Sequence, residues 1–239
     1  MMPRLIHKLR MWDYVAAQRV DHFIANSFNT AWRIAKYYWR TSKVIYPAIK
    51  IDDFPLEEEK DDYYFYIWRV IPYKKFDLLV DAFNENWKKL IVVTSTDNKL
   101  YRELRAKSAD NIYWIFWATN ETKMKLMAKA KAVLFPPEED FWIVPLEAMA
   151  CWTPVIAYWK WGALETVIEK LNPLDSSWIF FHEQTKESLN EAIVRFEKLR
   201  FSPRNIRKFA HNFDTSRFKE EIISFIEEKS RNHTFLKKI

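Results

Sequence analysis

The chain of 239 residues holds a single glycine, Gly162, and a single cysteine, Cys151. One cysteine excludes an intrachain disulfide and a cysteine-based metal site, and it makes a reducing cytoplasm the expected compartment. No run of about 18 apolar residues occurs, which excludes a membrane-spanning helix. The first residues also lack the apolar region of a secretory leader. With 49% apolar and 29% charged residues, the composition is typical of a soluble globular protein of one or two domains.

The scarcity of glycine is abnormal, because a chain of this length carries roughly 17 glycines at ordinary usage. Tryptophan, in contrast, occurs 12 times, which is several-fold above its ordinary usage. Folds in which strands and helices alternate need glycine at loop positions with positive φ. The exchange of one residue type for the other therefore needs its own explanation.

The order of predicted elements indicates the fold. The first part of the chain predicts helices and short strands at 9–20, 22–25, 30–38 and 43–47. Later strands are predicted at 63–67, 90–94, 111–116, 132–135, 154–158 and 179–181. They alternate with helices at 75–86, 98–108, 122–130, 143–150, 163–169 and 186–199, and helices at 204–211 and 216–231 follow. This alternation predicts an α/β fold with a doubly wound, Rossmann-like parallel sheet.

Ligands of such a sheet bind beyond the carboxyl ends of its strands, so the loops after the strands are candidate sites. The first of these loops carries Arg69 and Lys74, two cations next to a helix start. That arrangement can bind an anion such as a diphosphate. On spacing alone, two solvated charges in a basic chain are the favoured alternative.

A second loop and the helix after it carry two acidic residues eight positions apart, Glu139 and Glu147. A carboxylate in the loop can accept sugar hydroxyls, and one on the helix can hold a ribose diol. Such a pair also arises by chance and on any solvated helix face. It is a candidate binding site because it follows the predicted strand 132–135. Cys151 is expected to be a small buried apolar residue, because no base is patterned near it.

Together and in this order, the loops resemble the donor half of a retaining glycosyltransferase of family 4, also called glycosyl transferase group 1. Members of this family have two facing Rossmann domains, the arrangement known as GT-B. The segments that carry the resemblance are WRVIPYK at 68–74, PPEEDFWIVPLEAMA at 136–150, CWTPVIA at 151–157 and WGALE at 161–165. Upstream, residues 11–27 resemble the end of the acceptor domain in mannosyltransferase-like members, and residues 44–47 resemble the interdomain junction.

The resemblance implies transfer of a sugar, with mannose favoured, from a nucleotide-sugar such as GDP-mannose or a UDP-sugar to an acceptor hydroxyl. The products would be glycans or lipid-linked saccharides. By position, Arg69 and Lys74 would hold the diphosphate and stabilise it as it leaves. Glu139 would bind hydroxyls of the donor sugar, and Glu147 would bind the ribose. The resemblance implies no metal and no other cofactor.

Other donor contacts follow from the same resemblance. The main-chain N–H groups of Trp142 and Ile143 would approach the sugar or the phosphates, and Phe141 and Glu165 would belong to the donor-binding set. The choice of nucleotide base would depend on loop backbone near 94–97 and 115–118.

The resemblance also divides the chain. Residues 1–50 would be a remnant of the N-terminal acceptor domain with its junction, and 51–62 a linker. Residues 63–213 would be the nucleotide-sugar-binding domain, and 214–239 a helix that crosses back to the acceptor domain. A whole enzyme of this type needs about 150 further residues before this chain begins. The open alternative is a non-catalytic nucleotide-sugar-binding fragment that needs a separate acceptor-domain partner.

Many tryptophans occur where the family has glycine, namely Trp68, Trp142, Trp152, Trp159, Trp161 and, by the same comparison, Trp39, Trp87 and Trp178. We hypothesise that the gene uses UGA for glycine and that the sequence reads this codon as tryptophan. Trp12 resembles a genuine tryptophan, while Trp32, Trp114 and Trp117 are ambiguous. The alternative is selection of aromatic rings that stack on bases or sugars, and it predicts tryptophan on exposed faces rather than in tight turns.

The chain is basic, with a formal net charge of +6 and a pI near 9.2. Lysine and arginine concentrate in the first 45 residues. A solvated basic surface is one interpretation. Attraction to anionic lipid headgroups is another, and it would give a cytoplasmic protein a peripheral contact with the inner membrane face. Nucleic-acid binding ranks last, because the chain shows no recognisable nucleic-acid module.

Overall fold

A computed structural model describes residues 2–141, 143–160 and 178–236 of the chain. The chain forms two compact units, one of Met1–Pro47 with Phe218–Ile239 and one of Ala48–Arg217. The segment predicted as a linker, 51–62, belongs to the second unit, where Ile51 is buried. The helix predicted at 163–169, and with it Glu165, lies outside the described residues.

The smaller unit contains α1 (Met2–Gln18), β1 (Phe23–Ala25), α2 (Phe28–Tyr38), β2 (Ser42–Val44) and most of α10 (Thr215–Leu236). The two strands pair in parallel, and α2 packs against both of them. Ser27 caps α2: its side chain accepts a hydrogen bond from the Thr30 N–H at 3.0 Å. The first helix begins at Met2, earlier than predicted, because Pro3 is compatible with a first helical turn.

The larger unit is built on six parallel strands that are joined through helices. The strands are β3 (Tyr64–Ile67), β4 (Leu90–Thr94), β5 (Ile112–Phe116), β6 (Ala132–Phe135), β7 (Val155–Tyr158) and β8 (Trp178–Phe181). The helices are α3 (Phe76–Asn86), α4 (Lys99–Lys107), α5 (Asn120–Lys129), α6 (Ile143–Ala150), α8 (Lys186–Glu197) and α9 (Pro203–Ala210). The short 3-10 helices are η1 (Ile51–Asp53), η2 (Pro72–Lys74) and η4 (His211–Phe213).

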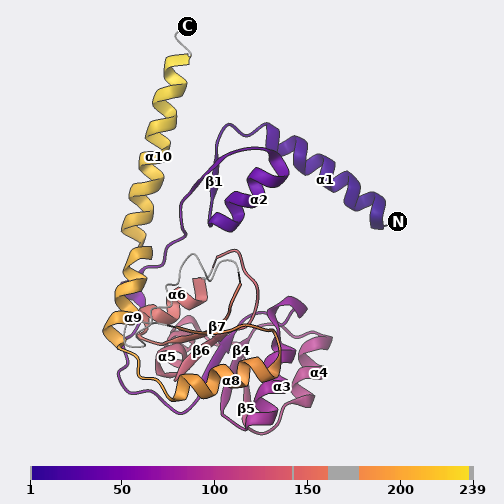
Figure 1. The fold of residues 1–239 in the computed structure, drawn as a ribbon, viewed down its shortest axis with the longest axis vertical. Helices are drawn as coiled ribbons and strands as arrows, with labels where there is room; N and C mark the ends of the chain where they lie inside the picture. Colours follow the sequence, from indigo (N-terminus) through magenta and orange to yellow (C-terminus); the bar gives the residue numbers. More distant parts are fainter. Residues whose placement is uncertain (1, 142, 161–177, 237–239) are drawn as a thin grey trace. The chain divides into compact units, whose positions relative to one another are not determined.

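The sheet has the order β5-β4-β3-β6-β7-β8, which in chain order is 3-2-1-4-5-6. This is the order of a Rossmann sheet, so the predicted doubly wound fold is confirmed. The order reverses between β3 and β6, which pair directly. In Figure 1, α3, α4 and α8 lie on one side of the sheet and α6 on the other, where it packs against α9.

Burial on both faces explains why the strands are continuous apolar runs. Every residue of β4, β6 and β8 is buried, as expected for a parallel sheet covered by helices on both sides. The main core lies between the sheet and the layer of α3 and α8, around Tyr64, Phe83 and Ile193. This core fixes the strands, and the strands fix the loops at their carboxyl ends.

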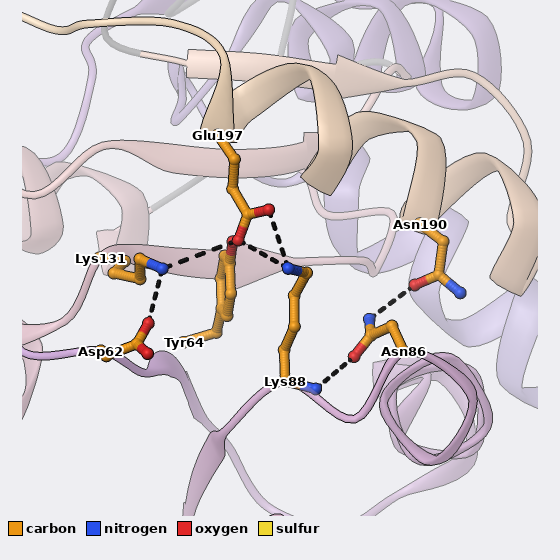
Figure 2. A network of polar contacts seen from close by, with 7 residues as sticks. All are labelled: Asp62, Tyr64, Asn86, Lys88, Lys131, Asn190 and Glu197. Carbon is orange, nitrogen blue, oxygen red and sulfur yellow. Dashed lines mark hydrogen bonds and ion pairs between the residues drawn. The ribbon is translucent and has the colours of Figure 1, made fainter.

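The amino ends of the strands are joined by a network of paired polar side chains (Figure 2). Glu197, the last residue of α8, accepts hydrogen bonds from Lys88 at 2.8 Å and from the Tyr64 hydroxyl at 3.0 Å. Lys131 lies 3.7 Å from Glu197 and 2.6 Å from Asp62. Beside them, the amides of Asn86 and Asn190 are hydrogen bonded to each other at 2.7 Å.

Candidate functional site

A cavity of about 300 Å³ opens at the carboxyl ends of β3, β4 and β5. Its walls come from the loops after these three strands and from α5 and α6, and its lining residues include Ile67, Trp68, Arg69, Thr94, Ser95, Trp117, Lys123 and Glu147. This is the edge of the sheet at which the strand order reverses, where ligands of such folds bind. The two loops predicted to choose the nucleotide base, 94–97 and 115–118, both contribute to its lining.

A second cavity, of about 440 Å³, adjoins the first one. Ile67, Lys123 and Glu147 line both cavities, and the second one extends toward η1 and along α5. Ile143, predicted as a donor contact, is exposed and lines this second cavity. The two cavities therefore form one concave region with Glu147 at its centre.

Glu147 is the distinctive charge of this region. It lies on α6 and is half-buried, and the loss of solvent around it raises the pKa of its carboxyl to about 7, with the charge of Lys123 acting in the opposite direction. Within the described part of the chain, no hydrogen bond or ion pair reaches this carboxylate. A half-buried carboxylate without a partner among the described residues, facing two cavities, is available to accept hydrogen bonds from a ligand.

Arg69 follows β3 directly, and its guanidinium is exposed at the wall of the first cavity. Asn98 donates a hydrogen bond to the carbonyl of Val70 at 2.8 Å, and the Tyr66 hydroxyl donates one to the carbonyl of Lys74 at 2.5 Å. Both bonds hold the loop that carries Arg69. These hydrogen bonds fix the backbone of the loop, and the loop positions the side chain of Arg69 at the cavity wall.

Lys74 and Glu139 form an ion pair. Lys74 is buried, and its ammonium also lies 3.0 Å from the centre of the Trp68 ring. Burial lowers the pKa of Lys74, and the hydrogen bond to Glu139 acts against that change. The sequence predicts that Lys74 and Glu139 each face the donor, whereas the structure shows them facing each other.

The structure brings the four charges predicted at the site to one edge of the sheet. Arg69 and Glu147 line the same cavity, and Trp68 of that cavity contacts Lys74, which binds Glu139. The catalytic and binding roles of these residues stay predictions.

Two other predicted donor contacts have different positions. Phe141 lines neither cavity; its ring packs near Phe213, 6.0 Å between the ring centres. Trp142 lies outside the described residues, as Glu165 does.

Sequence reasoning missed Lys123, which lines both cavities and acts on the charge of Glu147. It is one of several lysines on α5, and nothing in its spacing separates it from Lys125, which is exposed and paired with Glu121. Its position soon after the end of β5 was the available signal.

Cys151 is buried, and burial raises the pKa of its thiol to about 12. The thiolate, which is the reactive form, is therefore strongly disfavoured. This agrees with the expectation of a buried apolar role. Across the described ranges, no group of three or more His, Cys, Asp or Glu residues is placed to hold a metal ion. No helix among the same residues is both long and apolar enough to cross a membrane.

A Rossmann sheet with a charged cavity at its switch point defines a nucleotide-binding class of domain. Residues 48–213 match the family model described as glycosyl transferases group 1, and the chain belongs to this family.

Two curated relatives are mannosyltransferases. The chain is 24% identical over 227 residues to the O-antigen chain mannosyltransferase RfbU of Salmonella typhimurium, which covers 90% of this chain and 62% of RfbU. It is 32% identical over 97 residues to the alpha-1,3/1,6-mannosyltransferase alg2 of Schizosaccharomyces pombe, over 40% of this chain and 16% of that protein. The predicted likeness to mannosyltransferase members is thereby confirmed. The chain spans less than two thirds of the length of either relative.

The fold is shared with solved structures. Anabaena Alr3699/HepE in complex with UDP-glucose aligns with a TM-score of 0.75 and 20% identity, over 92% of this chain and 67% of that chain. A glycosyltransferase from Rickettsia africae aligns with a TM-score of 0.70 and 14% identity, over 87% of this chain and 63% of that chain.

Proposed function

We propose that this chain is the donor-binding part of a retaining glycosyltransferase. It would transfer a sugar, mannose in the first instance, from a nucleotide diphosphate sugar to an acceptor hydroxyl of a glycan or lipid-linked saccharide. The observation that carries the proposal is Glu147: a half-buried carboxylate without a partner among the described residues, which lines two cavities at the switch point of a Rossmann sheet. Family membership, the two mannosyltransferase relatives and the UDP-glucose complex of a protein with this fold support it.

In this proposal the charges around the cavities divide the donor between them. Arg69 and Lys123 bind the diphosphate and stabilise its charge as the bond to the sugar breaks. Glu147 accepts hydrogen bonds from the ribose hydroxyls in its deprotonated form. The proposal requires no metal, because cations of the protein neutralise the leaving group.

Lys74 and Glu139 have a linked role in the same proposal. Their ion pair orients Glu139 toward the site, and the hydroxyls of the donor sugar compete with Lys74 for its oxygens. Lys74 then turns its ammonium to the diphosphate. Donor binding would therefore exchange an internal ion pair for two contacts with the ligand.

Calorimetric titration of the full chain with GDP-mannose, UDP-glucose and UDP tests the proposal. We expect binding of a nucleotide-sugar by the parent chain and a marked weakening of that binding in Glu147→Gln and in Arg69→Ala. Arg102→Ala is the matched control, because Arg102 on α4 is exposed, pairs with Asp97 and lines neither cavity. The titration is repeated with Trp68→Gly, because glycine is the family's residue at this position. Absence of binding for every nucleotide, in both the parent chain and Trp68→Gly, would overturn the proposal.

A second candidate function is a non-catalytic nucleotide-sugar-binding fragment that a separate acceptor-domain partner completes. One observation favours it: α1 exposes a series of large apolar side chains, namely Leu5, Leu9, Met11, Trp12 and Val15. Apolar surface of this kind marks a face that another part covers. An acceptor domain encoded in frame upstream of Met1 would favour the transferase, and a start codon with its own ribosome site would favour the fragment.

The basic residues of the first 45 positions support a peripheral contact with anionic lipid headgroups, which would place a cytoplasmic protein at the inner membrane face. Sedimentation with vesicles tests this part of the proposal. We expect binding to vesicles with anionic lipid, weaker binding at high salt and none to neutral vesicles. Equal binding to both kinds of vesicle would contradict an electrostatic contact.

A further inference from the structure

Residues with positive φ form a distinctive group in this structure. Five non-glycine residues of the described chain have backbone in the left-handed region, and four of them are tryptophan: Trp39, Trp87, Trp117 and Trp152, with φ between 57° and 62°. Tryptophan supplies 12 of 239 residues in the chain. A residue with a Cβ is disfavoured in this region, and glycine is the residue that adopts it without strain. The enrichment is therefore opposite to what side-chain sterics favour.

Two of these residues end helices. Trp39 follows α2 and Trp87 follows α3, and each donates its backbone N–H at 3.1 Å to the carbonyl four residues earlier. This is the left-handed cap that commonly ends helices, and glycine is its usual residue.

Trp152 also ends a helix, α6, and here two backbone hydrogen bonds form the cap. Its N–H donates to the carbonyl of Met149 at 3.0 Å, and the N–H of Thr153 donates to the carbonyl of Ala148 at 2.9 Å. These two bonds make a Schellman motif, in which the left-handed residue is most often glycine. The indole N–H of Trp152 is buried and has no hydrogen-bond partner. The backbone of this position fits its surroundings, whereas the side chain does not.

The other side chains gain little from their positions. The rings of Trp39, Trp87 and Trp117 are 84%, 67% and 72% exposed. Trp114 shows what a tryptophan that fits looks like: its indole N–H donates to Ser108 at 2.9 Å, and its ring stacks on Phe76 within the core layer. These five tryptophans of the described chain thus fall into two classes.

We propose that residues 39, 87, 117 and 152 are glycine in the protein as the cell makes it, and that the codon read here as tryptophan, UGA, is decoded as glycine. The inference rests on backbone geometry and does not depend on the proposed activity. It assigns position 117, ambiguous from the sequence, to the glycine class, and position 114 to genuine tryptophan. It does not extend to Trp178, which lies buried in the extended strand β8.

Position 68 gives the proposal a consequence for the site. Trp68 lines the first cavity, its ring covers the ammonium of Lys74 at 3.0 Å, and its indole N–H is buried without a partner. The backbone of Trp68 is not left-handed, so its geometry does not support the proposal. Glycine at position 68 is instead a further prediction. Glycine at this position would enlarge the cavity and uncover Lys74.

Peptide mass spectrometry of the protein isolated from its native cells is the decisive test. We expect glycine at 39, 87, 117 and 152 and tryptophan at 114, with UGA behind the first four positions and UGG behind the last. Tryptophan at the four left-handed positions would overturn the proposal, as would UGG codons there. Glycine at 114 as well would overturn the division into two classes.

Recombinant full-length variants supply an independent test in which folding itself is the readout. Each single change of Trp39, Trp87, Trp117 or Trp152 to glycine should raise Tm by roughly 2–4 °C, because it removes left-handed strain. Changes of the same residues to alanine keep the Cβ and should give no such rise. Trp114→Gly should lower Tm. A glycine series that fails to exceed the alanine series would overturn the proposal.

Discussion

The two edges of the sheet in the larger unit treat charge in opposite ways. At the amino edge, Glu197 is surrounded by Lys88, Tyr64 and Lys131, and each charge in this network has a partner (Figure 2). At the carboxyl edge, Glu147 is half-buried and has no partner among the described residues, and Arg69 lines a cavity wall. The same scaffold therefore carries one set of charges that closes on itself and one that stays open to a ligand.

The pKa values express this difference. Burial alone would raise the pKa of Glu197, but hydrogen bonds from Lys88 and Tyr64 hold it below its ordinary value. Burial raises the pKa of Glu147 to about 7, because no comparable bonds compensate it. A lowered carboxyl pKa stabilises the folded state at neutral pH, while a raised one destabilises it. The amino edge thus adds to the stability of the fold, whereas the carboxyl edge leaves a charge uncompensated at a cost in stability, as the proposed donor binding requires.

The largest expected effect is a pH dependence of stability that comes from Glu147. Its pKa is raised on folding, so its contribution is fully present below its ordinary pKa and is lost as pH rises through about 7. We expect the free energy of unfolding to fall by about 2–3 kcal/mol over this window, and Glu147→Gln to abolish the fall. Urea unfolding at a series of pH values measures it. An equal slope in Glu147→Gln would show that another group is responsible.

The second effect is on ligand binding. Glu147→Gln should weaken the affinity for the nucleotide-sugar about 10- to 100-fold, because a charged acceptor for ribose hydroxyls is lost. Glu197→Gln changes the same residue type at the opposite edge and should leave the affinity unchanged. Calorimetric titration of both variants measures the difference. Equal losses in the two variants would break the functional contrast between the edges.

The third effect is a loss of stability when a charge at the amino edge is removed. Glu197→Ala should lower the free energy of unfolding by about 1 kcal/mol at pH 7.5, a value that allows for screening by solvent. Because the pKa of Glu197 is lowered on folding, its contribution is present above its ordinary pKa and is lost as pH falls through the lowered value. Urea unfolding at pH 7.5 and in acid measures it. A variant as stable as the parent at pH 7.5 would contradict a structural role for the network.

The smallest effect separates two lysines of one helix. Lys123→Ala should weaken nucleotide-sugar binding about three- to fivefold, since its charge lies at both cavities, and Lys125→Ala should change it less than twofold. Raising the salt concentration should reduce the difference between them. Titrations at low and high salt measure both quantities. Equal effects of the two changes would remove Lys123 from the site.

Much of the fold is visible in the sequence because strands buried on both faces must be apolar. The bounds of β4, β6 and α6 agree with the predictions to the residue, and most other elements of the larger unit agree within two residues. The first helix begins seven residues before its predicted start, since the apolar spacing continues back through Leu9, Ile6 and Leu5, and Pro3 is compatible with the first turn. The predicted elements of the smaller unit are present, although its strands are short.

The site was only partly visible. Arg69 and Glu147 follow strands that the sequence reveals, so their place at the carboxyl edge could be predicted. The ion pair of Lys74 with Glu139 could not, because the two residues belong to loops after different strands and their separation depends on the sheet order. Lys123 was missed because its helix carries several lysines, and only tertiary packing turns one of them toward the cavities.

The alternation of strands and helices follows from the order of residues alone, since apolar period and chain sterics act over a few residues. The family follows in the same way, from residues that keep their order along the chain. The tertiary structure alone decided which charges are paired, because pairing depends on distances across the sheet. It also decided which tryptophans are strained, since a residue letter does not fix the sign of φ, whereas the end of a packed helix does.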